Sequence, residues 1–339
     1  MSEDARITLG HGAGGRLTQR LIRELFLPAY GNEMLEPLGD AALLPATGGA
    51  LAFTTDGFVV SPLFFPGGDI GCLSVYGTVN DLAVAGARPL WLSLGMIIEE
   101  GLPLEDLRRV ARSVRDAAAR AGVQVVTGDT KVVERGKGDG LFITTAGVGL
   151  RRGAEPPRPL QPGDAILVSG PLGDHGAVIL SRQRGIRLES ELLSDCAPVT
   201  PLVDALFAAG MTPLFLRDPT RGGLCGVLAD LAGEDDPAAA LAVEADEGAI
   251  PVRPAVAAIG EITGIDPLHL ACEGRVVAVV AEDEAARALA AWRALPEGRE
   301  SALIGRMDAG SPGRVALRTI LGGRRLLLRP AADPLPRIC

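Results

Sequence analysis

The sequence is poor in lysine, histidine and aromatic residues, and it has no long uninterrupted apolar segment. Only Lys131 and Lys137 are lysines, and aromatic residues make up 4% of the chain. The formal net charge is −9, and no basic block provides the positive field that nucleic acid or an anionic membrane requires. No apolar run approaches a bilayer span, and the first residues lack a secretory signal pattern. We therefore expect a cytoplasmic protein that binds neither nucleic acid nor membrane.

The five cysteines form no Cys-x-x-Cys pair and have no histidine nearby at ligand spacing, so neither a disulfide framework nor a structural zinc site is expected. The last residue, Cys339, follows a proline-rich stretch at 330–336, which predicts an extended arm that carries a reactive thiol. The alternative is that a cysteine ends the chain incidentally. The other four are interpreted as small core residues: Cys72, Cys196, Cys225 and Cys272.

Strand and helix patterns alternate along the chain, which predicts a mixed α/β (α+β) protein. With 339 residues, 47% of them hydrophobic, the chain can form two cores. A stretch rich in Pro, Gly and Arg marks the boundary between them. The predicted parts are a Gly-rich segment with a helix (1–49), an N-terminal α/β domain (50–150), a linker (151–163), a larger C-terminal α/β domain (164–329) and a mobile tail (330–339).

The hydrophobic pattern predicts the elements of both domains. The strand after Pro89 is apolar on both faces, so we expect a second subunit to cover its exposed side. Strands are predicted at Ala50–Thr55, Leu90–Ile98, Val123–Thr127, Leu141–Leu150, Ala165–Ser169, Pro213–Arg217, Leu241–Glu244, Arg275–Ala281, Ala302–Arg306, Val315–Ile320 and Arg325–Leu328. Helices are predicted at 17–26, Ile70–Ala85, Leu104–Ala121, 174–184, 200–209, 222–232, 252–260 and 284–294.

Acidic residues stand at predicted strand ends or glycine turns, at Asp40, Asp56, Asp81, Asp129 and Asp218. Loops at strand ends converge on one edge of an α/β sheet, where ligands bind. Carboxylates gathered there repel one another unless a divalent cation holds them, and Mg²⁺ on nucleotide phosphates is the usual occupant. Each acidic residue taken alone is better explained as a helix cap or turn residue, but five of them in this order are harder to explain in that way. The absence of a Walker motif excludes a P-loop.

Two further features suit phosphate binding. The glycine-rich stretch Leu9–Arg16 leads into a helix pattern, and such a loop can present backbone N–H groups to phosphate, although N-terminal glycines are also common without this role. Lys131 follows Gly128-Asp129-Thr130. Because arginine fills nearly every other basic position, we interpret Lys131 as kept for a role that arginine cannot fill.

The acidic loops in this order, with Asn80-Asp81-Leu82-Ala83-Val84-Ala85-Gly86-Ala87, resemble the ATP-binding superfamily of aminoimidazole ribonucleotide synthetase, selenophosphate synthetase and thiamine-monophosphate kinase. Longer stretches narrow the resemblance to the carbamoyl dehydratase (HypE) family of nickel–iron hydrogenase maturation. It covers essentially the whole chain and implies a two-domain fold whose N-terminal, ATP-binding sheet pairs across a homodimer. These stretches are His11–Gly15, Phe64–Gly71, Gly128–Val133, Gly173–Gly176, Ser194–Pro198, Arg217–Gly223 and, most specific, Pro336–Cys339.

The resemblance implies ATP-dependent dehydration of an S-carbamoyl group on Cys339 to an S-cyanide (thiocyanate), which supplies cyanide ligands. Glu273 and Lys131 are the implied proton acceptors, and a phosphate contact is the open alternative for Lys131. The implied Mg²⁺ ligands are Asp40, Asp56, Asp81 and Asp218. The implied ATP contacts are His11, Gly12, Gly14, Gly15, Asp56, Asn80, Asp81, Asp129, Thr130, Gly173, Asp174, His175, Asp218, Thr220 and Arg221.

The resemblance also implies partners, namely the carbamoyltransferase HypF as donor and the HypC–HypD iron scaffold as cyanide acceptor. The chain departs from the family at Cys272-Glu273-Gly274, where Asn-Glu-Gly is usual, so the orientation of Glu273 is open. His269 replaces a usual aromatic residue and is interpreted as a packing substitution. Two alternatives to the dehydratase stand: another ATP-dependent kinase or synthetase of the superfamily acting on a free small molecule, and a nucleotide-regulated, non-catalytic thiol carrier.

Overall fold

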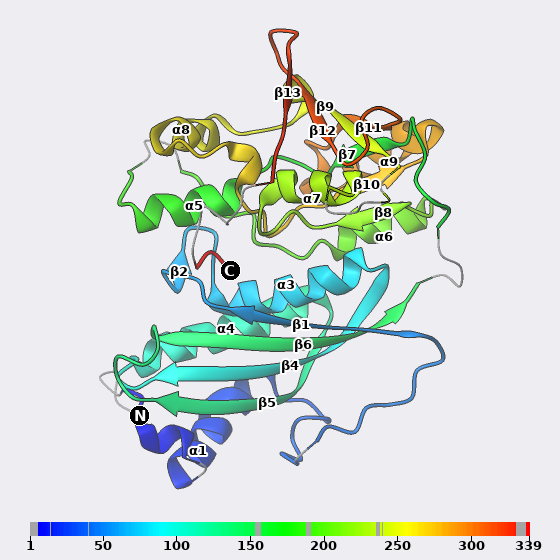
Figure 1. Cartoon of the computed structure of the whole chain (residues 1–339). Coiled ribbons are helices and arrows are strands. Elements are labelled where there is room, and N and C mark those ends of the chain that lie inside the picture. The colour runs from blue at the N-terminus through cyan, green and yellow to red at the C-terminus, as the bar shows by residue number, and fades with distance from the viewer. Residues whose placement is uncertain are drawn as a thin grey trace. The chain divides into compact units, whose positions relative to one another are not determined.

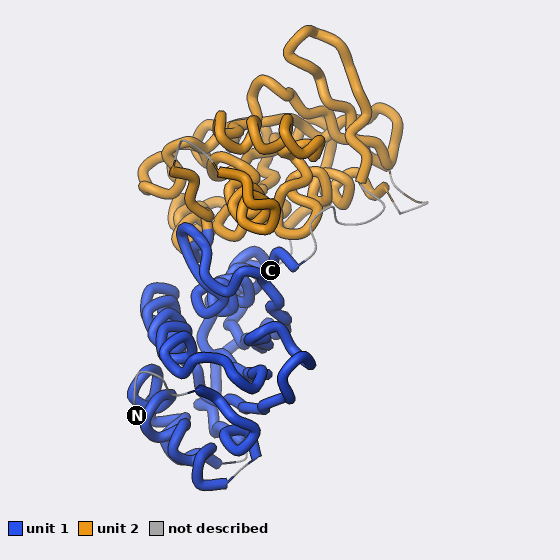
Figure 2. Tube along the Cα trace, turned by 90° about the vertical axis from the view of Figure 1, so that its left-hand side faces the viewer, with its two compact units in different colours: residues 1–152, 196–198, 337–339 blue, residues 153–195, 199–336 orange. Residues whose placement is uncertain are grey.

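The structure is a computed structural model, and it describes residues 6–13, 15–39, 41–152, 157–187, 191–234, 238, 240–329 and 337–339. Contacts divide the chain into two compact units, coloured separately in Figure 2. Unit 1 comprises residues 1–152, 196–198 and 337–339, and unit 2 comprises residues 153–195 and 199–336. The assignment changes after residue 152, inside the stretch interpreted as a linker. The C-terminal residues 337–339 belong to unit 1, while 330–336 lie outside the described residues.

Unit 1 contains a four-stranded sheet in the order β1-β6-β4-β5 (Figure 1). β6 is antiparallel to both of its neighbours, and β4 and β5 are parallel. Helices α3 and α4 pack against each other and against this sheet. The elements are β1 (Leu51–Phe58), the short hairpin β2 (Phe64–Phe65) and β3 (Gly68–Asp69), α3 (Ile70–Val84), β4 (Ala87–Glu99), α4 (Leu104–Ala121), β5 (Gln124–Val133) and β6 (Leu141–Arg151).

Helix α4 has the bounds that its amphipathic pattern predicts. Leu107, Val110 and Val114 recur at helical spacing, and all three are buried in the core of unit 1. Glu105 lies in the first turn, where the helix dipole favours a negative charge. Gly122 ends the helix in the left-handed region, with φ 69°, which glycine adopts without steric cost.

The N-terminal segment of unit 1 is less regular than its pattern predicts. The single helix expected at 17–26 consists of α1 (Arg16–Leu21) followed by a π-helical turn, η2 (Ile22–Phe26), and α2 (Leu27–Tyr30). A 3₁₀ turn, η1 (Leu9–Gly12), precedes them. A single π turn in a helix often marks a functional position.

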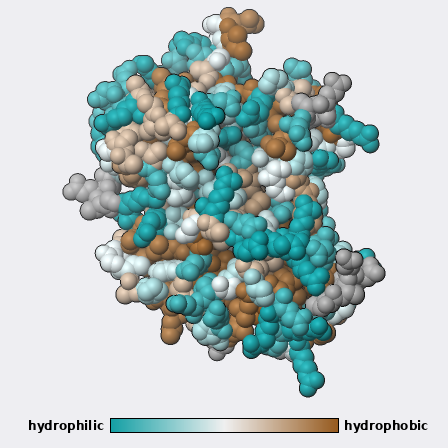
Figure 3. Space-filling view, turned by 180° about the vertical axis from the view of Figure 1, so that it is seen from behind, coloured by the Kyte–Doolittle hydropathy of each residue, from teal (hydrophilic) through white to brown (hydrophobic). Residues whose placement is uncertain are grey.

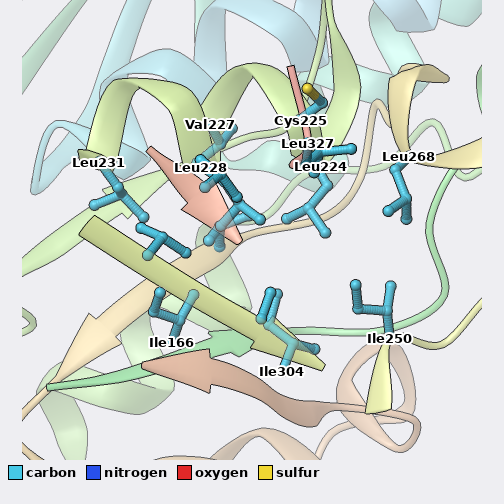
Figure 4. Close-up of a cluster of buried hydrophobic side chains, with 14 of the residues drawn as sticks. Ile166, Leu224, Cys225, Val227, Leu228, Leu231, Ile250, Leu268, Ile304 and Leu327 are labelled. Atoms are coloured by element: carbon cyan, nitrogen blue, oxygen red, sulfur yellow. The ribbon is translucent and has the colours of Figure 1, made fainter. Parts of the chain in front are cut away.

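Unit 2 contains a seven-stranded sheet in the order β13-β12-β9-β11-β7-β10-β8, antiparallel except for the β12–β9 pair. Leu224 and Leu228 of α7 pack with Ile166 and Ile304 of the sheet in one buried cluster (Figure 4). The elements are β7 (Ala165–Val168), α5 (Asp174–Gln183), α6 (Thr200–Ala208), β8 (Phe215–Arg217), α7 (Gly223–Ala232), β9 (Ala242–Asp246), η3 (Glu247–Ala249), α8 (Pro254–Thr263), η4 (Pro267–His269), β10 (Val277–Val280), η5 (Glu282–Glu284), α9 (Ala285–Arg293), η6 (Pro296–Gly298), β11 (Ala302–Asp308), β12 (Val315–Arg318) and β13 (Arg324–Leu326).

Some apolar side chains remain at the surface. The tip of the β12–β13 hairpin, which projects at the top of Figure 1 and appears brown in Figure 3, carries Ile320 and Leu321, exposed by 76% and 97%. In the described parts of the chain, no helix is both long and apolar enough to cross a membrane.

The packing of α4 gives a stability prediction. We expect Leu107→Ala to lower the free energy of unfolding of unit 1 by about 2–5 kcal/mol, because a fully buried leucine is replaced by a cavity. The matched control is Arg112→Ala on the exposed face of the same helix, where loss of its exposed ion pair with Glu105 costs at most about 1 kcal/mol. Urea unfolding followed by far-UV circular dichroism measures both. Equal losses in the two variants would contradict the assigned core face.

Candidate functional site

Asp56 and Asp81 lie on the same side of β1 in unit 1. Thr54 and Asp56 are two residues apart on the strand, so their side chains point to one face. On that face Thr54 Oγ1 donates to Asp81 Oδ2 at 3.0 Å, and a Cβ added at Gly77 would stand 3.4 Å from Asp56 Oδ2. The Asp56 carboxylate thus lies beside Gly77 of α3, and Asp81 lies one helical turn further along the same helix. One turn corresponds to roughly 5–6 Å along the helix axis, which approximates the separation of the two carboxylates in that direction. This arrangement offers the oxygen ligands that Mg²⁺ prefers.

The glycine loop meets β5 at the other edge of this sheet. A Cβ at Gly12 would stand only 2.3 Å from the backbone nitrogen of Val132, so this close approach requires glycine. Together with the N-terminal helical segment, the two stretches enclose a cavity of about 160 Å³. Its rim carries Gly128–Lys131, and its walls are mostly apolar, formed by Ile22, Phe26, Leu27, Tyr30, Leu35, Leu38, Leu94, Met96 and Val125.

Lys131 forms an ion pair on this rim. Its Nζ lies 2.8 Å from Asp129 Oδ1, and both side chains are exposed. The hydrogen bond from Lys131 is the main reason that the pKa of Asp129 is lowered, and the N–H of Thr130 also donates to that carboxylate. An ammonium group beside a carboxylate is better suited to contact phosphate than to accept a proton. The geometry therefore favours the phosphate-contact interpretation of Lys131.

The strand register aligns these features in one row across the sheet. Asp56 pairs with Thr145, Thr145 with Leu94, and Leu94 with Gly128. Because β6 and β4 lie between β1 and β5, the two ends of the row are about 14 Å apart. A single unit 1 thus holds the Asp56 and Asp81 carboxylates at one sheet edge and Lys131 with the glycine loop at the other.

Several residues of unit 1 that were predicted to contact the nucleotide are held in place by other residues of the chain. His11 is buried, and its Nδ1 accepts a hydrogen bond from the N–H of Thr8 at 3.1 Å. Asn80 Nδ2 donates to the carbonyl of Ala197 at 3.1 Å. Gly15 directly precedes α1. Two predicted residues, Gly14 and Asp40, lie outside the described residues.

The C-terminal residues lie beside the chain just after β1. The N–H of Val59 donates to the Cys339 carbonyl at 3.1 Å, and the N–H of Ser61 donates to the Arg337 carbonyl at 3.2 Å. Ile338 is buried, and Arg337 forms an ion pair with Asp139. Val59 follows Asp56 by three residues, a span of at most about 10 Å of chain. Unit 1 therefore holds the terminal thiol near the strand that carries Asp56.

Three loops of unit 2 leave one edge of its sheet. Val277, at the start of β10, pairs both with Val168 at the end of β7 and with Arg217 at the end of β8. The loops that follow β7 and β8, and the one that precedes β10, consequently meet there. They contain the predicted residues Gly173, Asp218–Arg221 and Glu273, and Asp174–Gly176 follow Gly173 in the first turn of α5.

Backbone hydrogen bonds join these loops. The N–H of Gly176 donates to the Ala271 carbonyl, and the N–H of Cys272 donates to the Pro219 carbonyl, both at 2.9 Å. A Cβ at Gly223 would stand 2.6 Å from the carbonyl oxygen of Leu268. The segment before Glu273 is therefore packed between the other two loops.

Asp218 and its neighbours form a tight turn after β8. Asp218 is buried, and its carbonyl accepts the N–H of Thr220 at 3.0 Å. The carbonyl of Thr220 in turn accepts the N–H of Gly223, which begins α7. Arg221 is exposed. Across the described residues, no group of three or more His, Cys, Asp and Glu is arranged to hold a metal ion.

Glu273 is positioned by residues that the sequence did not single out for this role. Its side chain is buried, and its backbone N–H donates to Asp195 Oδ1 at 3.1 Å. Arg275 Nε lies 3.5 Å from Asp195 Oδ2 and donates to the Pro171 carbonyl at 3.0 Å, and Arg275 Nη1 donates to the Glu297 carbonyl at 3.1 Å. Asp195 lies in a stretch used for the resemblance, but no local pattern indicated that Arg275 would be its partner.

Cys272 has a hydrogen-bonding role in place of the family's usual asparagine. The N–H of Gly173 donates to Cys272 Sγ at 3.1 Å. The thiol is completely buried, and burial raises its pKa well above the ordinary value, so it stays neutral. Asp195 thus holds the backbone of Glu273, and Cys272 holds the Gly173 turn.

Asp174 and His175 begin α5 and are buried. His175 Nδ1 lies 2.8 Å from Ser194 Oγ. Asp174 Oδ2 pairs with Arg253 Nε at 3.0 Å. Burial, and then the charge of nearby Asp195, raises the pKa of Asp174 to about 6.

Comparison with known proteins identifies the family. Residues 38–151 match the model of the AIR synthase related protein N-terminal domain, and residues 161–318 match that of its C-terminal domain. Carbamoyl dehydratase HypE of Rhizobium leguminosarum bv. viciae is 46% identical over 339 residues, which cover 99% of this chain and 96% of that protein. The chain belongs to the HypE family.

Solved structures agree with the HypE assignment. The hydrogenase maturation protein HypE in complex with ATP superimposes with a TM-score of 0.91 at 44% identity, covering 98% of this chain and 99% of that one. A HypE chain from a HypE–HypF complex matches with a TM-score of 0.78 at 42% identity, covering 91% and 99%. The predicted family and the predicted two-domain α/β fold are confirmed.

The raised pKa of Asp174 gives a pH prediction. Folding favours the protonated form, so this group's contribution to stability is fully present below pH 3.8 and is lost as the pH rises through about 6. Asp174→Asn has no charge to bury. We expect wild type to lose about 1–1.5 kcal/mol of unfolding free energy relative to this variant between pH 5 and pH 8.

Urea unfolding at both pH values measures this difference. Asp116→Asn is the matched control, because the Asp116 side chain is 67% exposed. A wild-type-minus-variant difference that is the same at both pH values would show that Asp174 does not titrate in this range.

Proposed function

We propose that this chain dehydrates an S-carbamoyl group on its own Cys339 to an S-cyanide, using ATP, and so supplies cyanide ligands for nickel–iron hydrogenases. The observation that carries the proposal is the contact of the C-terminal residues with the chain just after β1. The thiol to be modified is thereby held by the unit that carries Asp56 and Asp81. The carbamoyl dehydratase names of its relatives support the same reaction.

The residues of unit 1 fit a nucleotide with Mg²⁺. The apolar walls of the cavity suit a planar base, and Gly12 and Lys131 on its rim suit phosphate. Asp56 and Asp81 supply carboxylate oxygens for the metal, and a metal-binding role for Asp40 and Asp218 stays a prediction from the sequence. Mg²⁺ held there would offset charge on the phosphates. The ATP complex of a HypE relative supports ATP as the nucleotide.

Dehydration needs the amide oxygen to leave and the nitrogen to lose its protons. Phosphorylation by ATP turns that oxygen into part of a phosphate, which is a good leaving group. We assign removal of a nitrogen proton to Glu273, whose backbone is fixed by Asp195. Lys131 contacts phosphate in this scheme. Exclusion of water matters because the activated intermediate would otherwise be hydrolysed.

A homodimer would complete this site. The two ends of the row that joins Asp56 to Gly128 are too far apart for one sheet to bring its carboxylates to Lys131. The face of the sheet opposite the helices carries Leu51, Phe53 and Ile97, exposed by 57%, 72% and 41%. A second copy packed on this face would cover these apolar side chains.

We further propose that HypF donates the carbamoyl group and that HypC–HypD accepts the cyanide, in the cytoplasm. A relative's complex with HypF supports the first of these steps.

Intact-mass measurement tests the reaction. After incubation with ATP and a carbamoyl donor system, the full-length chain should gain one carbamoyl group on Cys339 and then lose one water. A chain that ends at Ile338 should do neither, whereas Cys225→Ala, a buried thiol elsewhere, should behave as wild type. A carbamoyl group that never loses water while ATP stays intact would favour the thiol carrier. ATP turnover that needs a free small molecule and survives removal of residues 330–339 would favour a kinase.

The role of Glu273 has its own test. Glu273→Gln should accept the carbamoyl group but form cyanide about 10²–10⁴ times more slowly, because the proton acceptor is lost. Glu282→Gln, at a carboxylate with a 60% exposed side chain, is the matched control. Quenched time points analysed by mass spectrometry separate the two steps. Normal turnover in Glu273→Gln would remove this residue from the mechanism.

A further inference from the structure

Two thiols of unit 1 that have no role in the proposed reaction face each other. Cys72 Sγ and Cys196 Sγ are 3.8 Å apart, although 124 positions separate the residues in the sequence. Both were interpreted from the sequence as small core residues, and no sequence pattern indicated that their sulfur atoms would approach each other. Asn80, two turns further along α3, donates to the carbonyl of Ala197. The stretch 196–198 is thus held against the helix that carries Cys72.

The surroundings of Cys72 favour reaction of its sulfur. Cys72 lies in the first turn of α3, where the helix dipole stabilises a thiolate, and it is partly exposed. The N–H of Asp69 donates to its Sγ at 3.2 Å. The hydrogen bond with Cys196 is the main cause of a lowered pKa of Cys72, and burial and the Asp69 charge oppose it. Cys72 is therefore the attacking thiol of the pair and Cys196, which is buried, the second one.

The two buried thiols of unit 2 provide a contrast. Cys225 Sγ donates to the Leu328 carbonyl, and Cys272 Sγ accepts the N–H of Gly173. Both are buried, and burial raises the pKa of each. They lie in unit 2 and have the character of structural cysteines.

We propose that Cys72 and Cys196 form a reversible disulfide by exchange with a low-molecular-weight disulfide such as oxidised glutathione. The Cys72 thiolate attacks one sulfur of the small disulfide and releases one small thiolate, which takes up the proton that Cys72 lost. The Cys196 thiolate then attacks Cys72 Sγ in the mixed disulfide and releases the second small thiol. In total the two cysteines give up two electrons and two protons, and the small disulfide becomes two thiols.

The geometry allows this bond with a small movement. A disulfide requires the sulfur atoms to approach to about 2.05 Å. Cys196 lies in a stretch without helix or strand, so it can move toward α3. The bond would tie this stretch to α3. Its neighbour in the chain, Asp195, accepts the N–H of Glu273, so oxidation would also restrain the residue that positions Glu273.

Peptide mapping tests the proposal directly. The full-length chain with Cys339→Ser, which removes the terminal thiol from competition, is incubated with oxidised glutathione, blocked with an alkylating agent and digested. We expect one peptide that contains Cys72 to be linked to one that contains Cys196. The mass of the linked pair should be two hydrogens below the summed masses of the two free peptides, and it should include no glutathione. Dithiothreitol should separate the two peptides. Each further variant carries one more substitution in the Cys339→Ser chain. With Cys196→Ser, glutathione should remain on Cys72, and with Cys72→Ser, the link should not form. With Cys225→Ser, the link between Cys72 and Cys196 should form as before.

The result in the parent chain does not depend on the folding of these variants. Recovery of Cys72 and Cys196 as alkylated, unlinked peptides under conditions that oxidise a model dithiol peptide would overturn the proposal. A linked peptide that joins either residue to Cys225 or Cys272 would overturn it as well, because that product requires an unfolded chain.

Discussion

Compensation of buried charge is the constraint on which the candidate site of unit 2 depends. The side chains of Asp174 and Asp195 are only 4% and 1% exposed, and two carboxylates in a weakly polar interior repel each other. Arg275 lies within 4.0 Å of both, and Arg253 adds a second cation beside Asp174. Burial, and then the charge of Asp195, still raise the pKa of Asp174 although both arginines lower it. Through Asp195, Glu273 is thus linked to an electrostatic network that includes Arg275.

The sequence predicted local elements better than their long-range pairing. The bounds of α4 follow from one amphipathic stripe, which is a local property. β5 was predicted to end at Thr127 but continues to Val133, because residues 128–133 pair with β4. Gly128 and the polar residues after it resemble a turn in the sequence. They are tolerated in a strand here because β5 is at the edge of its sheet and hydrogen-bonds to one neighbour only.

Long-range contacts were also the part of the candidate site that the sequence did not predict. The resemblance selected the loops around Gly173 and Asp218, and the structure places both at one sheet edge. It also assigned His11 and His175 to nucleotide contacts, which stays a prediction, but it did not indicate that their Nδ1 atoms lie beside Thr8 and Ser194. A histidine's ring partner depends on folding, so its type and position in the sequence do not reveal it. For the same reason neither the Asp195–Arg275 pair nor the approach of two distant thiols was predictable.

The contacts of the C-terminus are of a kind that permits release. Val59 and Ser61 each donate one backbone hydrogen bond to the terminal residues, a short form of the strand addition by which sheet edges bind peptides. Each such bond contributes about 0.5–1.5 kcal/mol net, and burial of Ile338 adds about 1.5–3 kcal/mol. The ordering of a terminal arm opposes these gains. A docking this weak exchanges readily, which is consistent with the proposed transfer of a group to and from the terminal thiol.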